Sequence, residues 1–317
     1  MNTITGLLLV IAIVVLPVLV SLVFEALRKQ PEIPASLYWS DDIPIQYTKV
    51  DGIKIRYVKT GHGPNLLLLH TLRTQLDIFE KVIPELSRNF TVYAPDYPGH
   101  GFSDIPDTDY TPDFFVTFVE RFLEIMNLEK VTLAGISIGG SIPLLIAAKK
   151  NTRIKNIISI NPYDYGNGRG VERGNFIARL IFTLARIPVL GETVMRFRNS
   201  IIEGKIMQGG VSNPGSLTKD FLQQVWASGT RKGHYRGFIN LIRNSDKWEK
   251  ARSRYTGINI PVLLVYGDKD WSRENERERN IKDIPAARVE FVENGGHFLS
   301  LDQPDVFIQL IRKFVNV

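Results

Sequence analysis

The chain has 317 residues, of which 44% are hydrophobic and 23% are charged, and its formal net charge is +6. This profile is typical of a globular protein with one large domain, or one domain plus an inserted piece. The absence of cysteine excludes disulfides, a thiolate nucleophile and cysteine metal sites. No two of the five histidines have H-x-x-x-H spacing, so we expect no catalytic metal ion.

The first 29 residues are predicted to form a membrane anchor. Residues 4–24, ITGLLLVIAIVVLPVLVSLVF, carry no charge and as a helix would span roughly 30 Å, the thickness of the bilayer hydrocarbon. A cleaved signal peptide is the alternative, but no Lys or Arg precedes the apolar run and no A-x-A site follows it. Arg28 and Lys29 follow the run, and the positive-inside bias then predicts a single-pass membrane protein whose large domain is cytoplasmic.

After a linker at 30–42, which contains two prolines, the sequence alternates between strand-like and helix-like segments. Two strand-like runs flank Asp51-Gly52, which predicts a hairpin. The predicted strands are 43–50, 53–60, 65–70, 90–96, 130–136, 154–162, 260–267 and 287–294, and the predicted helices are 76–86, 113–128, 141–150 and 305–315. Alternation of this kind after an initial hairpin predicts an α/β fold, with a mostly parallel eight-stranded sheet and helices on both faces.

One segment interrupts the alternation. Residues 167–257 contain no clear strand and are too long for a bare loop, so we expect an inserted helical cap between two parts of the core, 43–166 and 258–317. The cap has 16 Lys and Arg against 6 Asp and Glu, a net charge of +10. It is either a solvated basic face or a surface that attracts anionic lipid headgroups or an anionic substrate. No motif predicts nucleic-acid binding, and nothing in the sequence reveals the oligomeric state.

A serine at position 137 has the context of a nucleophile. The stretch VTLAGISIGGS places Ser137 in a G-x-S-x-G pattern between a predicted strand and a predicted helix. This strand–turn–helix arrangement is what a nucleophile elbow requires, and Gly135 and Gly139 keep the tight turn free of side chains.

A serine hydroxyl needs a base and an acid to become reactive. His297 follows the last predicted strand, and Asp270 follows the strand before it, so the order Ser137, Asp270, His297 predicts a catalytic triad. Asp164 is the alternative acid, and Asp268 is expected to support the turn. The backbone N–H groups of Ile138 and Leu72 are the predicted oxyanion hole.

Further polar and aromatic residues near these positions have open or structural roles. Arg73 is either a contact for a substrate carboxylate or a surface residue. We expect His70, His100 and Trp271 to hold loops or to pack.

Together the ordered segments LLLLH, DYPGHGFSD, GISIGG, YGDKDW and NGGHFLSLDQP resemble the α/β-hydrolase superfamily over residues 47–317. The closest resemblance is to capped serine hydrolases similar to monoacylglycerol lipases and meta-cleavage-product hydrolases. The family usually has His-Gly where this chain has His70-Thr71. Relatives with an aspartate nucleophile include epoxide hydrolases and dehalogenases, and a serine at position 137 argues against both activities.

The resemblance and the triad predict a membrane-anchored serine hydrolase that cleaves a carboxylic ester of a lipophilic or lipid substrate without a cofactor. Thioester hydrolysis, C–C bond hydrolysis and acyl transfer use the same elbow and stay open as alternatives. A non-catalytic scaffold with the same fold is a further alternative.

Overall fold

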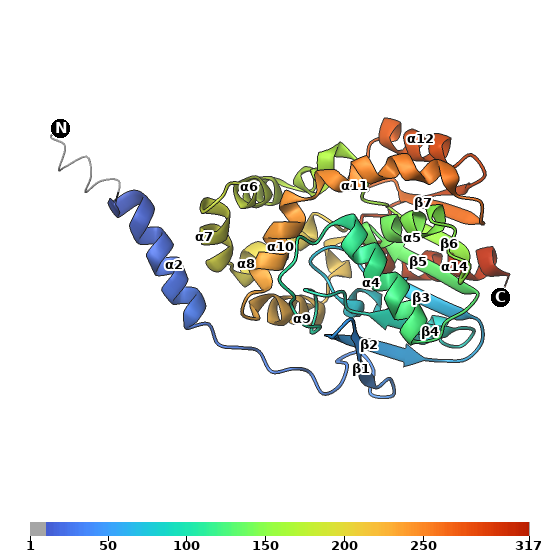
Figure 1. The fold of residues 1–317 in the computed structure, drawn as a ribbon, viewed down its shortest axis with the longest axis horizontal. Coiled ribbons are helices and arrows are strands. Elements are labelled where there is room, and N and C mark those ends of the chain that lie inside the picture. Colours follow the sequence, from blue (N-terminus) through green and yellow to red (C-terminus); the bar gives the residue numbers. More distant parts are fainter. Residues whose placement is uncertain (1–10, 317) are drawn as a thin grey trace.

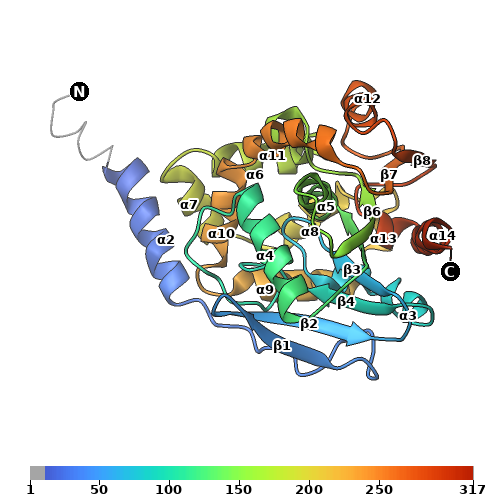
Figure 2. The same ribbon diagram turned by 45° about the vertical axis from the view of Figure 1, so that its right-hand side comes forward.

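The computed structural model of the chain describes residues 11–316, and the part of the predicted anchor before Ile11 lies outside them. From Ile11 onward, the predicted anchor segment forms a short π-helix, η1 (Ile11–Val15), followed by the α-helix α2 (Leu16–Ala26). Between residues 11 and 316, no helix combines the length and the apolar character that crossing a membrane requires. In Figures 1 and 2, α2 lies beside α7 (Leu190–Arg196), on the side of the molecule away from the C-terminus.

A single sheet of eight strands forms the centre of the fold, as predicted. The strands are β1 (Ile45–Val50), β2 (Ile53–Thr60), β3 (Asn65–Leu69), β4 (Thr91–Pro95), β5 (Val131–Ile136), β6 (Ile154–Ile160), β7 (Val262–Gly267) and β8 (Arg288–Val292). Their order is β1-β2-β4-β3-β5-β6-β7-β8. The pairs β1·β2 and β2·β4 are antiparallel, and all the other pairs are parallel.

The predicted hairpin between β1 and β2 is confirmed. Ile53 pairs with Val50, and the turn residues Asp51 and Gly52 both have positive φ, at 48° and 83°. Such a two-residue turn matches the twist of the strands that it joins.

Helices cover both faces of the sheet, and the side chains of each strand alternate between the two sides. Leu67 and Leu69 pack with one set of helices, whereas Leu66 and Leu68 pack with the other set. The first set contains α4 (Pro112–Ile125), α5 (Ile138–Ala148) and α11 (Asp246–Ala251), and the second contains η2 (Leu76–Phe79), α3 (Ile83–Leu86), α13 (Leu299–Asp302) and α14 (Pro304–Val315). Central strands such as β3 and β5 are therefore apolar on both faces, which explains their continuous apolar sequence.

One helix prediction was wrong, and one helix was not predicted. The helix expected at 76–86 is two short pieces, η2 and α3, and Pro84 lies in the first turn of α3, where its missing N–H is tolerated. Helix α12 (Glu274–Asp283) was not predicted, because the residues that it buries, Glu276 and Asn280, are polar.

All the regular secondary structure between β6 and β7 is helical, and no strand lies in this segment. Besides α7 and α11 it contains α6 (Phe176–Ala185), α8 (Ser200–Gln208), α9 (Lys219–Thr230), α10 (His234–Arg243) and four short 3₁₀ turns. It has its own small core, in which Phe182 of α6 packs edge-to-face on Phe238 of α10. Figure 1 shows α6, α7 and α10 between α2 and the sheet.

Candidate active site

Ser137 lies at the sharp turn between β5 and α5. Its backbone has φ 63° and ψ −123°, a conformation that is unfavourable for a residue with a side chain. Hydrogen bonds hold it there: the Ser137 N–H donates to the Ile160 carbonyl at 2.9 Å, and the Ser137 carbonyl accepts from Tyr163 N–H at 3.2 Å. Strain that is held in this way is typical of a functional position.

Two glycines let the elbow pack closely on the sheet. A Cβ at Gly135 would lie 2.1 Å from the carbonyl oxygen of Gly139, and a Cβ at Gly139 would lie 2.1 Å from that of Leu69. Neither distance is possible for a real side chain, so the glycines are required for β3, β5 and α5 to approach one another.

The structure brings Asp270 and His297 together. His297 Nδ1 lies 2.5 Å from Asp270 Oδ1, and both side chains are fully buried. The other carboxylate oxygen, Oδ2, accepts hydrogen bonds from the Ser272 N–H at 2.9 Å and the Ser272 hydroxyl at 2.5 Å. Burial alone would raise the pKa of Asp270, but the contacts with His297 and Ser272 outweigh burial and lower that pKa below its ordinary value. Asp270 is therefore a carboxylate that can orient the imidazole.

The other ring nitrogen of His297 is available for chemistry. Nε2 is buried and has no hydrogen-bond partner among the described residues. Ser137 lines the same cavity as Trp271 and Phe298, which both contact the imidazole of His297. No hydrogen bond joins the Ser137 hydroxyl to Nε2 within residues 11–316. Such bonds often form only when substrate is bound.

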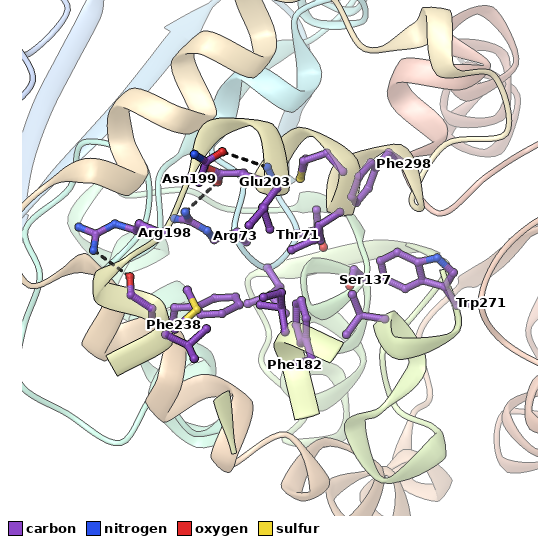
Figure 3. A pocket seen from close by; sticks show the side chains of 18 of the residues that line it. Thr71, Arg73, Ser137, Phe182, Arg198, Asn199, Glu203, Phe238, Trp271 and Phe298 are labelled. Atoms are coloured by element: carbon purple, nitrogen blue, oxygen red, sulfur yellow. Dashed lines mark hydrogen bonds and ion pairs between the residues drawn. The ribbon is translucent and has the colours of Figure 1, made fainter. Parts of the chain in front are cut away.

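The imidazole of His297 is stacked on an indole. The ring centroids of His297 and Trp271 are 3.7 Å apart and their planes differ by 17°. Trp271 Nε1–H donates to the Gly209 carbonyl at 2.7 Å, so the cap holds the indole in place. Figure 3 shows Trp271 next to Ser137. Trp271 thus packs, as expected, and the group on which it packs is the candidate base.

Of the two predicted oxyanion donors, Ile138 follows Ser137 in the chain and Leu72 lines the same cavity. Ile138 is the first residue of α5, where a helix leaves N–H groups unpaired. Thr71 and Leu72 line the cavity together with Ser137. His70 supports their loop, because its Nδ1 lies 2.8 Å from the Thr71 carbonyl and its Nε2 accepts the Tyr97 N–H at 3.0 Å.

A cavity of about 250 Å³ lies in front of Ser137, and most of its wall is apolar. The apolar lining includes Leu72, Val171, Phe182, Met195, Ile206 and Phe238, mainly from the cap. A cavity of this kind suits an apolar group of a small molecule.

The cavity wall contains one ion pair, between Arg73 and Glu203. Arg73 Nη2 lies 2.8 Å from Glu203 Oε1, and both side chains are largely buried. Figure 3 shows the pair at a distance from Trp271 along the cavity. Burial raises the pKa of Glu203, although Arg73 acts in the opposite direction. Arg73 is therefore not a surface residue, and its guanidinium already has a carboxylate partner.

The remaining candidates do not join the site. Asp164 accepts hydrogen bonds from Asn280 and from the Tyr255 hydroxyl, and not from His297, so it is not the orienting acid. Asp268 is exposed, and His100 is buried against the ring of His70. Within residues 11–316 no three His, Asp or Glu side chains gather in an arrangement that could hold a metal ion.

Sequence reasoning missed three supporting residues. Ser272 bonds Asp270, Glu203 pairs with Arg73, and Asn161 Nδ2–H donates to the carbonyls of Gly296 and His297 at 3.0 and 3.2 Å. Asn161 could have been found, since it is a polar residue directly after a buried strand, where parallel sheets place functional groups. Glu203 carries no such signal.

Comparison with known proteins places the chain in a family. The family model described as alpha/beta hydrolase fold matches residues 64–304, more than half of the chain. The chain therefore belongs to the α/β-hydrolase fold family. Its relatives include an uncharacterised hydrolase of Saccharomyces cerevisiae, which is 31% identical over 84% of this chain and 95% of that protein. An uncharacterised protein of Mycobacterium tuberculosis is 25% identical over 86% of this chain and 81% of that protein.

Solved structures share the fold at lower identity. Cfl2 from Burkholderia cenocepacia superposes with a TM-score of 0.77 at 21% identity, and covers 90% of this chain and 99% of its own. The haloalkane dehalogenase DbeA from Bradyrhizobium elkani gives a TM-score of 0.76 at 19% identity, over 87% and 98% of the two chains. These likenesses concern the fold alone.

Proposed function

We propose that the protein is a serine hydrolase that cleaves a carboxylic ester through an acyl-enzyme. The observation that carries this proposal is the strained Ser137, which lines the same cavity as Trp271 and Phe298. The rings of these two residues contact the imidazole of the buried Asp270–His297 pair. In the family to which the chain belongs, this combination suits nucleophilic attack at a carbonyl carbon.

The proposed reaction has two halves. The Ser137 oxygen bonds to the carbonyl carbon while His297 Nε2 takes the hydroxyl proton, and the N–H groups of Ile138 and Leu72 stabilise the oxyanion. The C–O bond to the leaving group then breaks, and His297 gives its proton to the departing alkoxide. Water, activated by His297, releases the acid from Ser137 in the same way. Asp270 keeps its charge and stabilises the imidazolium in both halves.

The apolar cavity favours a lipophilic ester over a charged one, because its wall offers few polar groups apart from the Arg73–Glu203 pair. Thioesters, C–C bonds next to a carbonyl and acyl acceptors other than water require the same groups, and a substrate panel decides among them. Some relatives are named epoxide hydrolases, such as epoxide hydrolase 3 of Xenopus tropicalis, 23% identical. The serine at position 137 argues against that activity here.

Labelling with a fluorophosphonate tests the proposal. Ser137→Ala should abolish labelling and hydrolysis of p-nitrophenyl esters, with a loss in rate of about 10³-fold or more. Ser253→Ala, at an exposed position, is the matched control and should label like the wild type. Labelling that persists in Ser137→Ala, or no labelling of the wild type, would favour a different nucleophile or the non-catalytic scaffold.

We also propose that residues 4–24 anchor the protein in a membrane with its catalytic domain in the cytoplasm. The uncharged sequence and the two basic residues after it support this proposal. The full chain should resist carbonate extraction from membranes, and a C-terminal tag should be digested by protease only after the cells are opened. Complete release by carbonate would exclude the anchor.

A further inference from the structure

The cap exposes large apolar side chains on three consecutive helices. We define the apolar cap face by six of them: Phe176, Leu180, Val189, Leu190, Phe197 and Ile201. Phe176 and Ile201 are the most exposed, at 75% and 72%. Helices α6 and α8 already bury other residues, such as Phe182 and Met207, so these six side chains are not needed for the core of the cap. The three helices adjoin, since α6 contacts both α7 and α8, and exposed apolar residues on adjoining helices mark an interaction site.

The cavity in front of Ser137 opens beside this face. Phe197 and Ile202 line the cavity, yet they are 39% and 40% exposed, so the same side chains contact both the cavity and the exterior. They flank the junction between α7 and α8. A molecule that enters between them would reach Ser137 through an apolar path without crossing the polar surface of the core.

Helix α2 borders the same junction. The ring of Phe24 lies 5.7 Å from that of Phe197, and Glu25 forms a buried ion pair with Arg198 at 2.8 Å. Figures 1 and 2 both show α2 against α7, on the side away from β7 and β8. The described part of the uncharged segment, residues 11–24, therefore ends beside the apolar cap face.

The charge around the face is positive. From Phe176 to Gln208 the sequence has five basic residues, Arg179, Arg186, Arg196, Arg198 and Lys205, against two acidic ones, Glu192 and Glu203. Arg179 and Lys205 are exposed. Apolar side chains mixed with exposed cations are the combination that binds at the headgroup level of an anionic bilayer.

We propose that the apolar cap face docks on a bilayer that contains anionic lipid, so that the cavity opens into the membrane and takes its substrate from there. This inference rests on the proposed function, since it assigns to the Ser137 site a substrate dissolved in the bilayer. A second copy of the chain is the competing occupant of the face, but it would not explain why the cavity opens on the face beside α2.

The absence of cysteine allows a direct test on the full chain, since each introduced cysteine is unique. Phe176→Cys and Ile201→Cys report on the face. The matched controls are Phe291→Cys on β8 and Ile125→Cys on α4, which replace apolar side chains that are 61% and 46% exposed elsewhere. Each variant carries a bimane label and is reconstituted in vesicles of phosphatidylcholine and phosphatidylglycerol that contain nitroxide-labelled lipid. Bimane at positions 176 and 201 should be quenched about tenfold more strongly than at positions 125 and 291.

Activity supplies the second readout. Phe176→Glu and Ile201→Glu should reduce hydrolysis of a vesicle-embedded ester about tenfold and leave hydrolysis of a water-soluble butyrate ester unchanged, because neither residue lines the cavity. Phe291→Glu should leave both rates unchanged.

Three results would overturn the inference: equal quenching at all four positions, no association of the chain with vesicles, or labels on the face that lipid nitroxides cannot reach because a second copy covers them. Fluorophosphonate labelling of Ser137 and butyrate hydrolysis, measured on the same samples, test the proposed function separately. If the wild type shows neither labelling nor butyrate hydrolysis, the proposed serine hydrolase activity is contradicted, whatever the quenching in vesicles shows.

Discussion

The imidazole of His297 is held from two sides, by the Asp270 carboxylate at Nδ1 and by the indole of Trp271 against its plane. In the proposed reaction a proton taken from Ser137 turns the ring into an imidazolium, and an aromatic face attracts a cation by about 0.5–2 kcal/mol. We therefore expect Trp271 to position the imidazole and to stabilise the imidazolium of the proposed reaction.

Substitutions of Trp271 should separate these effects. Trp271→Leu removes the aromatic face and should lower kcat about tenfold, equivalent to about 1.4 kcal/mol. Trp271→Phe keeps an aromatic face and should retain most of the wild-type kcat. The decisive readout is the split between kcat and KM, because a residue that positions the base acts on kcat, whereas a residue of the cavity wall acts on KM. A Leu variant with an unchanged kcat and an altered KM would show that Trp271 serves only as cavity wall.

His70, which supports the loop of Thr71 and Leu72, makes the stability of the fold depend on pH. Burial lowers the pKa of His70 from 6.5 to about 3, although its hydrogen bond to Thr71 acts in the opposite direction. The unfolded chain therefore binds a proton below pH 6.5 that the folded chain does not, and stability falls as the pH drops from 6.5 towards 3. This one group should lower the free energy of unfolding by about 2 kcal/mol between pH 7.5 and pH 5.

The difference between wild type and His70→Gln isolates that group. Glutamine can still accept the Tyr97 N–H but does not titrate, so urea unfolding of the variant should lose about 2 kcal/mol less than the wild type over the same pH range. His62→Gln changes an exposed histidine and should follow the wild type. If the free energies of unfolding of His70→Gln and the wild type fall equally as the pH drops, the imidazole of His70 is not held neutral in the folded chain.

At the scale of elements, the elbow depends on how closely α5 approaches β3 and β5. A methyl group at position 135 would meet the Gly139 carbonyl oxygen at 2.1 Å, so the helix or the strand must shift. Gly135→Ala should therefore cost about 3 kcal/mol in the free energy of unfolding and abolish fluorophosphonate labelling in the folded fraction.

Gly257→Ala is the control for this substitution. The nearest atom to its new Cβ would be the Ala148 carbonyl oxygen at 3.6 Å, an ordinary contact. Its stability should change by less than about 0.5 kcal/mol, as measured by urea unfolding. A Gly135→Ala variant as stable and as reactive as the Gly257→Ala variant would show that the elbow is not tightly packed.

Helices and strands whose apolar residues form one face or a continuous run could be predicted from the sequence. A helix that buries mainly polar residues could not. The strands and α4 bury apolar residues at the period of their own structure, and the pattern shows it. Helix α12 buries Glu276, which pairs with Arg173 of the cap, and Asn280, which bonds Asp164. These contacts join residues more than 100 positions apart, and no local pattern encodes them.

At the scale of the whole molecule, the site residues of the core could be predicted from the sequence, whereas those of the cap could not. That Ser137, Asp270 and His297 lie at one edge of the sheet could be predicted, because each residue follows a strand of the parallel part of the sheet, where the strand ends meet. The cavity lining could not, since Phe182, Glu203 and Phe238 come from short helices whose packing follows no simple topology rule. The cap also exposes apolar residues, which removes the periodicity that marks a buried face.

The contact between α2 and the cap connects the N-terminal segment to the active-site cavity. Glu25 pairs with Arg198 and with Arg28, and Arg198 also lines the cavity. Removing one charge from a buried pair leaves the other uncompensated, at a cost of about 3 kcal/mol. Glu25→Gln should therefore release α2 and expose the bonds after Arg28 and Lys29.

Limited trypsin digestion measures this release. Cleavage at the start of the linker should be at least about tenfold faster in Glu25→Gln than in the wild type, because the open form is more populated. Glu32→Gln, an exposed change in the same linker, should not alter the rate. Since Arg198 then loses a partner at the cavity wall, the KM for a soluble ester should change in Glu25→Gln and not in Glu32→Gln. If cleavage accelerates while KM stays constant, α2 is attached to the cap but does not influence the site.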